Sequence, residues 1–214
     1  MTRPMTEALI DSHDAALFDL DGVVYLGSEV VPAAPATMSR LRARGVGVGF
    51  VTNNAARATT VVADQLTDMG IPAAPSDVVS SAEAVTALVA TELGQGTRVL
   101  IAATSNVDDL ARKRGLVPVH GADEHPQAVI QGYDPDIEWS RLEEAAFAVQ
   151  AGAHWYASNP DMTRPTDRGL VPGLGAQLAV VGEDLGGVPA SGNVPGHLAS
   201  CGVDDGNLIV SRVG

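Results

Sequence analysis

The stretch Ala15-Ala16-Leu17-Phe18-Asp19-Leu20-Asp21-Gly22 joins a short apolar run to two acidic residues and a glycine. An apolar run bounded by turn residues is typical of a buried strand. Residues i and i+2 of an extended chain project to the same side, so Asp19 and Asp21 are expected to present their carboxylates together. The stretch therefore predicts a buried strand with a pair of acidic side chains at its carboxyl end.

Apolar runs and helical patterns alternate on the carboxyl side of this stretch. Strand-like runs occupy 15–18, 46–51 and 77–79, and helical patterns occupy 35–44, 62–69 and 80–89. Ser80 and Glu83 form a capping-box pattern at the start of the last helix. This alternation predicts a parallel sheet with crossover helices.

A second alternating group follows Gly94 and Gly96. Its strand-like runs are 98–102, 127–132 and 154–157, and its helical patterns are 108–114 and 137–151. The segment 169–175 is rich in Gly and Pro, which favours a linker that returns the chain to the first group. In the last forty or so residues, only 208–210 has a convincing strand pattern.

The acidic pair indicates a specific chemistry. Two carboxylates about 4 Å apart repel each other by roughly 4 kcal/mol at an effective dielectric of 20, so they need a cation or a shared proton. Mg²⁺ prefers oxygen ligands and commonly bridges to a substrate phosphate, and an aspartate can act as nucleophile to form an aspartyl phosphate. The alternative is a solvated acidic turn. Asp19 and Asp21 alone do not distinguish such a turn from a magnesium and phosphate site.

Thr52, Asn53 and Asn54 follow the second buried run. If the first two strands are neighbours, a hydroxyl and two amides would converge on the edge that holds Asp19, where ligands bind in open α/β sheets. These groups can donate hydrogen bonds to a phosphoryl oxygen. The alternative is a turn in which Thr and Asn act as helix caps.

Several motifs together resemble the haloacid dehalogenase superfamily, subclass IIA, the p-nitrophenyl-phosphatase-like branch. Within it, the sequence is most similar to actinobacterial glycerol-3-phosphate phosphatase-like members. The segments that carry the resemblance are 19–25, 51–57, 129–134, 157–161 and 163–173. The resemblance implies a doubly wound parallel α/β core at 12–95 and 173–214, incomplete at its carboxyl end, with an inserted α/β cap of the C2 type at 96–172.

The resemblance also implies roles for individual residues. Asp19 would attack phosphorus, Asp21 would act as acid and then base, and Thr52 would hold the phosphoryl group. Asp19 and Asp21 would ligate Mg²⁺, and the substrate would be a small phosphorylated metabolite such as glycerol 3-phosphate or phosphoglycolate. Asn53 and Asn54 would bind substrate. Asn159 and Asp161 would also bind substrate, although a structural turn explains these two equally well.

Two features depart from the family pattern. The family has a lysine in a Gly-Lys-Pro motif, whereas this chain has Gly192-Asn193-Val194-Pro195 there and its single lysine is Lys113. The metal-binding aspartates expected after the fourth core strand are also missing, because Asp204 and Asp205 precede that strand. The composition after Val180 suggests a truncated or altered carboxyl end, and weak or absent phosphatase activity is expected.

Composition limits the partners. The chain has 214 residues, is 45% hydrophobic and carries a net charge of −13 from 26 acidic and 13 basic residues. So acidic a chain argues against a basic face for nucleic acid. No signal peptide or membrane span is apparent, so we expect a cytoplasmic protein that does not bind membranes. The sequence leaves the oligomeric state open, with a homodimer among the options, and Cys201 is expected to be passive.

Three other functions compete with a phosphatase. A non-catalytic remnant would bind only metal or phosphate, and the missing lysine favours it. A receiver domain of the response-regulator type also forms an aspartyl phosphate, but it has no room for the long insert after Thr52. A Rossmann nucleotide binder is disfavoured because the glycines of 45–49 lead into a strand instead of a helix.

Overall fold

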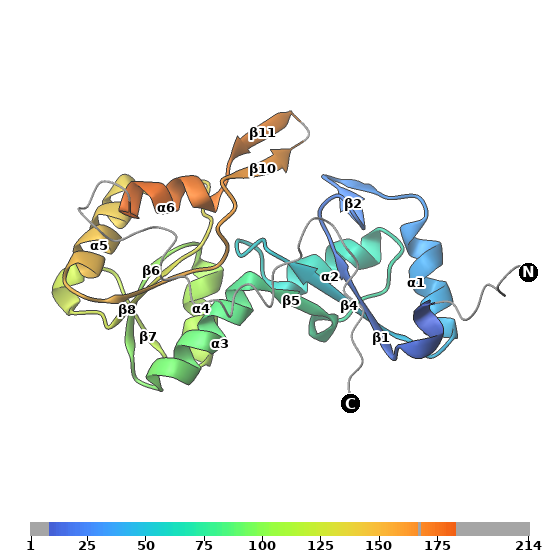
Figure 1. Cartoon of the computed structure of the whole chain (residues 1–214), viewed down its shortest axis with the longest axis horizontal. Helices are drawn as coiled ribbons and strands as arrows, with labels where there is room; N and C mark the ends of the chain where they lie inside the picture. Colours follow the sequence, from blue (N-terminus) through green and yellow to red (C-terminus); the bar gives the residue numbers. More distant parts are fainter. Residues whose placement is uncertain (1–8, 167, 183–214) are drawn as a thin grey trace, which may run out of the picture. The chain divides into compact units, whose positions relative to one another are not determined.

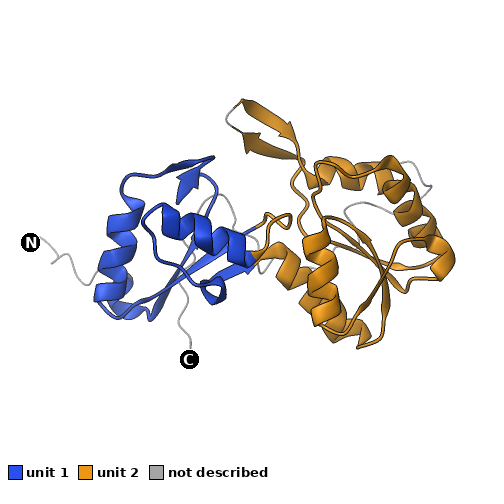
Figure 2. Ribbon diagram, turned by 180° about the vertical axis from the view of Figure 1, so that it is seen from behind, with its two compact units in different colours: residues 1–52, 59–79, 203–214 blue, residues 53–58, 80–202 orange. Residues whose placement is uncertain are grey.

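The structure, a computed structural model, describes residues 9–166 and 168–182. These residues form two compact units (Figures 1 and 2). Unit 1 contains 9–52 and 59–79, and unit 2 contains 53–58, 80–166 and 168–182. Each unit encloses hydrophobic clusters of its own.

Unit 1 is built around a three-stranded sheet with the strand order β1-β4-β5. Strands β1 and β4 are parallel, with Asp19 paired to Val51 at their carboxyl ends. The elements of this part of the chain are η1 (Leu9–Ser12), β1 (Ala15–Asp19), β2 (Tyr25–Leu26), β3 (Glu29–Val30), α1 (Ala34–Ala43), β4 (Gly47–Thr52), α2 (Thr59–Asp68), η2 (Pro75–Asp77) and β5 (Val78–Ser80).

The core of unit 1 follows from the two periodicities of its sequence. Val48 and Phe50 lie two apart in β4 and are both buried, while Val62 and Leu66 lie four apart on the buried face of α2. These side chains belong to one cluster with residues of the turn after β1 and of α1. One hydrophobic cluster therefore holds the sheet and its helices together.

Unit 2 is built around a four-stranded sheet in which every pairing is parallel, in the order β7-β6-β8-β9. A separate antiparallel hairpin, β10 and β11, precedes the last helix. The elements are α3 (Ser81–Leu93), β6 (Arg98–Ala102), α4 (Ser105–Lys113), β7 (Val117–Val119), η3 (Ala122–Glu124), β8 (Ala128–Gln131), α5 (Trp139–Gln150), β9 (His154–Ala157), β10 (Thr163–Thr166), β11 (Gly169–Pro172) and α6 (Leu174–Gly182).

Helices cover both faces of this second sheet. Val99 and Ile101 of β6 pack with residues of α3 and α4, whereas Leu100 and Ala102 pack with residues of α5 and α6. A strand buried on both faces reads as a continuous apolar run, which is why 98–102 lacks polar alternation. The predicted α/β class with parallel sheets is confirmed.

The predicted linker at 169–175 is wrong. Gly169–Pro172 forms β11, and α6 begins at Leu174. The glycines here allow close packing: a Cβ on Gly173 would lie 2.5 Å from the carbonyl oxygen of Asp161, and one on Gly175 would lie 2.4 Å from that of Pro160. The predicted strand at 208–210 lies outside the described residues.

The packing units divide the chain at different places from the predicted domains. Helix α3 packs against β6 and β8 in unit 2, although the prediction assigned residues up to 95 to the core. Helix α6 packs with α5 in the same unit. The boundaries 12–95 and 173–214 for a core and 96–172 for a cap therefore remain a prediction about functional domains.

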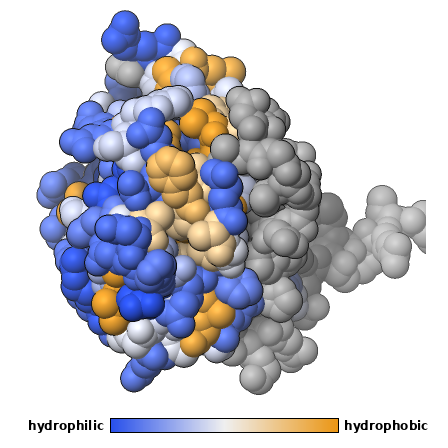
Figure 3. Space-filling model, turned by 90° about the vertical axis from the view of Figure 1, so that its left-hand side faces the viewer, coloured by the Kyte–Doolittle hydropathy of each residue, from blue (hydrophilic) through white to orange (hydrophobic). Residues whose placement is uncertain are grey.

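Figure 3 shows one face of the molecule, where apolar groups interrupt a largely hydrophilic surface. The exposed apolar side chains include Trp139 and Phe147 of α5, which are 62% and 57% exposed. Within residues 9–166 and 168–182, no helix is both long and apolar enough to cross a membrane.

Leu66→Ala tests the unit 1 core. Leu66 is fully buried, so the truncation should lower the free energy of unfolding by about 2–5 kcal/mol through lost transfer energy and a residual cavity. Val61→Ala is the matched control in the same helix, because Val61 is 51% exposed and its truncation should cost about 0.5 kcal/mol or less. Urea denaturation of both variants measures the difference, and equal losses would contradict this packing.

Candidate active site

The turn after β1 fixes the two aspartates. The carbonyl of Leu20 accepts hydrogen bonds from the backbone N–H groups of Val23, Val24 and Tyr25, at 3.3, 3.0 and 3.2 Å. The side chains of Leu20, Val24 and Tyr25 are fully buried, which anchors the turn to the core of unit 1. Asp19, half-buried, and Asp21, exposed, flank the buried Leu20.

Backbone geometry reinforces this turn. Oδ1 of Asp19 accepts the N–H of Leu20 at 2.8 Å, which restrains the carboxylate. Gly22 adopts a φ of +83°, a left-handed conformation that favours glycine, and its N–H donates to the carbonyl of Tyr25 at 2.7 Å. A substituent at position 22 would be strained although the space around it is open.

Thr52 lies at the same edge of the sheet. It ends β4 and follows Val51, the register partner of Asp19 in the parallel pair. Thr52 is buried, with only 2% of its surface exposed. The prediction that the first two strands are neighbours and carry Asp19 and Thr52 to one edge is confirmed.

The remaining predicted site residues lie in unit 2. The side-chain amide of Asn53 donates to Oδ2 of Asp161, and Nδ2 of Asn159 donates to the carbonyl of Asn53 at 2.9 Å. Oδ1 of Asn159 accepts the N–H of Asp161 at 3.0 Å. The structure therefore brings Asn53, Asn159 and Asp161 together as a mutually bonded cluster.

Asn54 makes a local turn. Its Oδ1 accepts the N–H of Ala56 at 3.0 Å, the side-chain pattern that stabilises a turn within two residues. The turn alternative considered for this segment is thus present in the structure. Asn54 remains a predicted substrate-binding residue through its amide group.

The acidic turn provides ligands of the kind that Mg²⁺ prefers. The Asp19 carboxylate and the Asp21 backbone carbonyl are hard oxygen donors, and Mg²⁺ is typically held by one or two carboxylates with water and phosphate completing its shell. In the described part of the chain, no group of three or more His, Cys, Asp or Glu residues is arranged to hold a metal ion. The donor set fits a partial magnesium site that substrate or further residues would complete.

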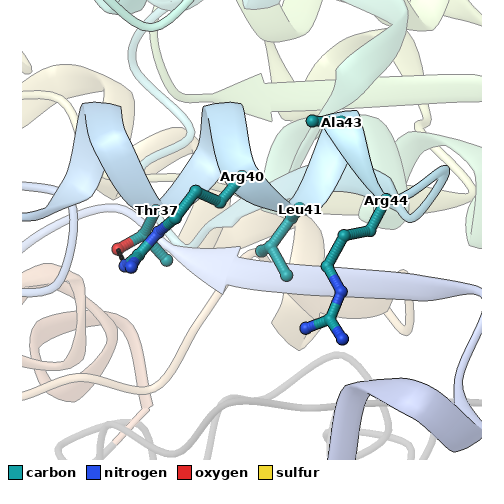
Figure 4. Close-up of a pocket in the computed structure, with 5 residues that line it drawn as sticks. All are labelled: Thr37, Arg40, Leu41, Ala43 and Arg44. Atoms are coloured by element: carbon teal, nitrogen blue, oxygen red, sulfur yellow. Dashed lines mark hydrogen bonds between the residues drawn. The ribbon is translucent and has the colours of Figure 1, made fainter.

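A hollow on α1 lies elsewhere in unit 1. It is lined by Thr37, Arg40, Leu41, Ala43 and Arg44, and Arg40 reaches back to Thr37 (Figure 4). Arg44 pairs at 2.8 Å with Asp11, which precedes the amino end of β1. This hollow therefore belongs to the end of the sheet opposite Asp19.

Three groups in the described part of unit 2 have clearly shifted pKa values. Burial raises the pKa of Asp108 despite the opposing charge of Arg112, and burial together with a 2.8 Å hydrogen bond to Glu92 raises that of Tyr156. Two backbone N–H groups, from His120 and Gly121, lower the pKa of Glu124. None of the three is among the predicted site residues.

Two residues near the cluster escaped the sequence interpretation. Oγ of Ser81 donates to the carbonyl of Asn53 at 2.7 Å, and Nδ2 of Asn106 donates to the carbonyls of Ala55 and Arg57 at 3.0 and 3.3 Å. Asn106 is about 50 positions away from its partners in the sequence. No local pattern could have revealed it.

Known proteins similar to this chain are phosphatases. A family model for haloacid dehalogenase-like hydrolases matches residues 16–117. D-glycerol 3-phosphate phosphatase of Mycobacterium tuberculosis is 41% identical over 175 residues, which cover 82% of this chain and 49% of that protein. Acid sugar phosphatase of Staphylococcus aureus is 34% identical over 177 residues, which cover 83% of this chain and 67% of that protein.

Solved structures agree with these relatives. A crystal structure of glycerol phosphate phosphatase from Mycobacterium tuberculosis, in complex with magnesium, matches with a TM-score of 0.81 and 40% identity over 86% of this chain and 55% of that one. The 4-nitrophenylphosphatase of Thermotoga maritima has the same fold, with a TM-score of 0.78 at 24% identity over 86% of this chain and 69% of that one.

The chain spans about half the length of the Mycobacterium tuberculosis relative. It nevertheless covers two thirds of the Staphylococcus aureus relative at 34% identity, and the matched region includes the acidic turn. On this evidence, the chain belongs to the haloacid dehalogenase-like hydrolase family.

Proposed function

We propose that this chain has the architecture of a Mg²⁺-dependent phosphomonoester hydrolase that acts on a small phosphorylated metabolite through an aspartyl phosphate on Asp19. One observation carries the proposal. Asp19 ends β1 and Asp21 follows it, at the edge of the sheet where Thr52 ends the parallel neighbour β4. Carboxyl ends of parallel strands are where open α/β sheets bind ligands.

In the first step, a carboxylate oxygen of Asp19 attacks phosphorus and the ester P–O bond breaks. Asp21, protonated at the start, gives its proton to the leaving alcohol oxygen. The hydrogen bond from the N–H of Leu20 to Oδ1 of Asp19 restrains the nucleophile. Thr52 donates a hydrogen bond to the transferring phosphoryl group, as its place beside Asp19 suggests.

In the second step, Asp21 takes a proton from a water molecule, and that water attacks phosphorus. The bond between phosphorus and the Asp19 oxygen breaks, which frees inorganic phosphate and restores both carboxylates to their starting states. Asn53, one peptide bond beyond Thr52, would orient the nucleophile and substrate. Asn54, Asn159 and Asp161 are proposed to contribute to the substrate side of the site.

Magnesium would be held by the carboxylate of Asp19 and by Asp21, and when bound it would neutralise charge on the phosphoryl oxygens. Two acidic side chains so close to a phosphate dianion need such a counter-charge. The relative crystallised with magnesium is a glycerol phosphate phosphatase, which supports the choice of metal.

The substrate class comes from the relatives. The Mycobacterium tuberculosis relative is a D-glycerol 3-phosphate phosphatase and the Staphylococcus aureus relative is an acid sugar phosphatase. We therefore propose a small polar phosphomonoester, with glycerol 3-phosphate and phosphoglycolate as the first compounds to test.

Turnover by residues 1–214 is expected to be weak. The single lysine, Lys113, is the last residue of α4 in unit 2 and is exposed. Loss of one preorganised group that stabilises transition-state charge lowers the rate by about 10²–10³. The second candidate function, a non-catalytic remnant that binds only metal or phosphate, is favoured by the same observation.

Asp19→Asn should abolish magnesium-dependent hydrolysis of p-nitrophenyl phosphate by the 1–214 chain, because an amide cannot form the aspartyl phosphate. Asp14→Asn is the matched control: Asp14 is exposed at the opposite end of β1 and only its carbonyl bonds to the sheet. The assay follows release of p-nitrophenol. Equal turnover by wild type and Asp19→Asn would show that Asp19 is not the nucleophile.

Thr52→Val should lower kcat for the same substrate by about 10²-fold, since it removes a hydroxyl donor and keeps the shape of a buried side chain. Thr52→Ser retains the hydroxyl and should keep most of the rate. Steady-state kinetics of the two variants make the comparison. A Val variant as active as the Ser variant would remove Thr52 from the mechanism.

Magnesium removal separates the candidate functions. Chelation by EDTA should stop hydrolysis, and added Mg²⁺ should restore it. Calorimetric binding of Mg²⁺ without any turnover would instead support the remnant. Stable labelling by a small phosphodonor, without release of phosphate, would support a receiver and contradict the hydrolase.

A further inference from the structure

The segment 53–58 is unusual in its packing. It follows β4 and precedes α2, both in unit 1, yet it belongs to unit 2. Ala55 is fully buried in the cluster formed by α3, α4, β6 and β8. Ala55, three positions after Thr52, is therefore part of the core of the other unit.

Polar side chains of unit 2 bind the backbone of this segment. Nδ2 of Asn106 donates to the carbonyls of Ala55 and Arg57, at 3.0 and 3.3 Å. The carbonyl of Asn53 accepts hydrogen bonds from Nδ2 of Asn159 and Oγ of Ser81, at 2.9 and 2.7 Å. Oγ1 of Thr104 donates to the carbonyl of Ala56 at 3.4 Å. Four carbonyls of the segment are thus held by side chains.

These side chains lie where the second sheet would be expected to bind a ligand. Thr104 and Asn106 follow β6, and Asn159 follows β9. The helix after β6 covers one face of the sheet and the helix after β8 covers the other, so the neighbouring strands β6 and β8 define a topological switch point. The crevice at such a point is the usual ligand position in open α/β sheets.

In this chain, the segment itself lies at this end of the sheet. A Cβ on Gly132, directly after β8, would lie at an ordinary contact distance of 3.6 Å from the Cβ of Ala55. The end of β8 is therefore directly beside the segment. Residues 53–58 therefore occupy the position in unit 2 where a bound ligand would be expected.

We propose that Asn106 is a positioning residue that holds the segment after Thr52 in a single conformation, so that Thr52 and Asn53 are presented correctly to the phosphoryl group. Its catalytic consequence rests on the phosphatase function proposed above. A carboxamide has two N–H donors, and Asn106 faces two carbonyl acceptors. An acidic side chain at 106 would turn both attractions into repulsions.

The substitution Asn106→Asp distinguishes a role in positioning the segment 53–58 from a role in stabilising α4. Asn106 lies in the first turn of α4, where a negative charge favours the helix. If Asn106 served only α4, Asp would be neutral or stabilising. If Asn106 instead holds the segment, the Asp variant should release the segment.

The test is limited trypsin digestion of the whole chain, with fragments measured by mass spectrometry. Trypsin can cut after Arg57, inside the segment, and the held conformation should protect that bond. We expect Asn106→Asp to speed this cut by about 10- to 100-fold, the effect of losing two hydrogen bonds on a local opening equilibrium. Cuts after Arg40 and Arg44, in unit 1, should keep their wild-type rates.

Asp109→Asn is the matched control. It exchanges the same two residue types on α4, and the Asp109 side chain is 68% exposed and bonded to Arg112. It should leave the Arg57 cut unchanged. Asn106→Ala, which removes the donors without adding charge, provides a second variant if Asn106→Asp does not fold by circular dichroism, and should also speed the cut.

Equal cleavage after Arg57 in wild type, Asn106→Asp and Asn106→Ala would overturn the proposal, as would rapid cleavage of that bond in the wild type. Where the wild type hydrolyses p-nitrophenyl phosphate, Asn106→Asp should lower kcat more than it raises KM, while Asp109→Asn matches wild type. Faster cleavage with unchanged kcat would overturn the catalytic half. A wild type without turnover refutes the phosphatase proposal, and the digestion still decides whether Asn106 holds the segment.

Discussion

The parallel pairing of β1 with β4 is the constraint on which the acidic site depends. Asp19 is paired with Val51, so the carboxyl ends of the two strands coincide and Thr52 follows directly. The same register runs through the whole pair, with Leu17 opposite Gly49 and Phe18 opposite Phe50. A slip of one residue would turn each side chain of the strand to the other face of the sheet and separate the acidic pair from Thr52.

The fold class was predictable because its signals are local. Each predicted strand within the described residues is a short apolar run, and buried parallel strands have that pattern. The capping pattern of Ser80 and Glu83 is also realised, with the N–H of Glu83 donating to Oγ of Ser80 at 3.3 Å. What failed was the interpretation of the Gly- and Pro-rich segment 169–175 as a return linker: Gly173 and Gly175 allow α6 to begin against the backbone of 160–162.

The candidate site was predictable only in part. Asp19, Asp21 and Thr52 are recognisable because each lies at the carboxyl end of a strand of the same sheet, which is a consequence of local sequence and simple topology. The partners of Asn53 were not predictable in detail, since Asn159 and Asp161 lie 106 and 108 positions away. Their identity depends on how β9 and the segment 53–58 pack in unit 2, which no pattern of a few residues encodes.

These two groups of residues solve different physical problems. The acidic turn concentrates negative charge and therefore requires a cation or a proton before it can accept a phosphate. The segment 53–58 carries one charged side chain, Arg57, and its backbone carbonyls are held by neutral donors from Asn106, Asn159, Ser81 and Thr104. Its hydrogen bonds therefore fix a backbone and bring no carboxylate into the segment. Thr52 stands at the junction of the two, because its strand is set by unit 1 and the residue after it is held by unit 2.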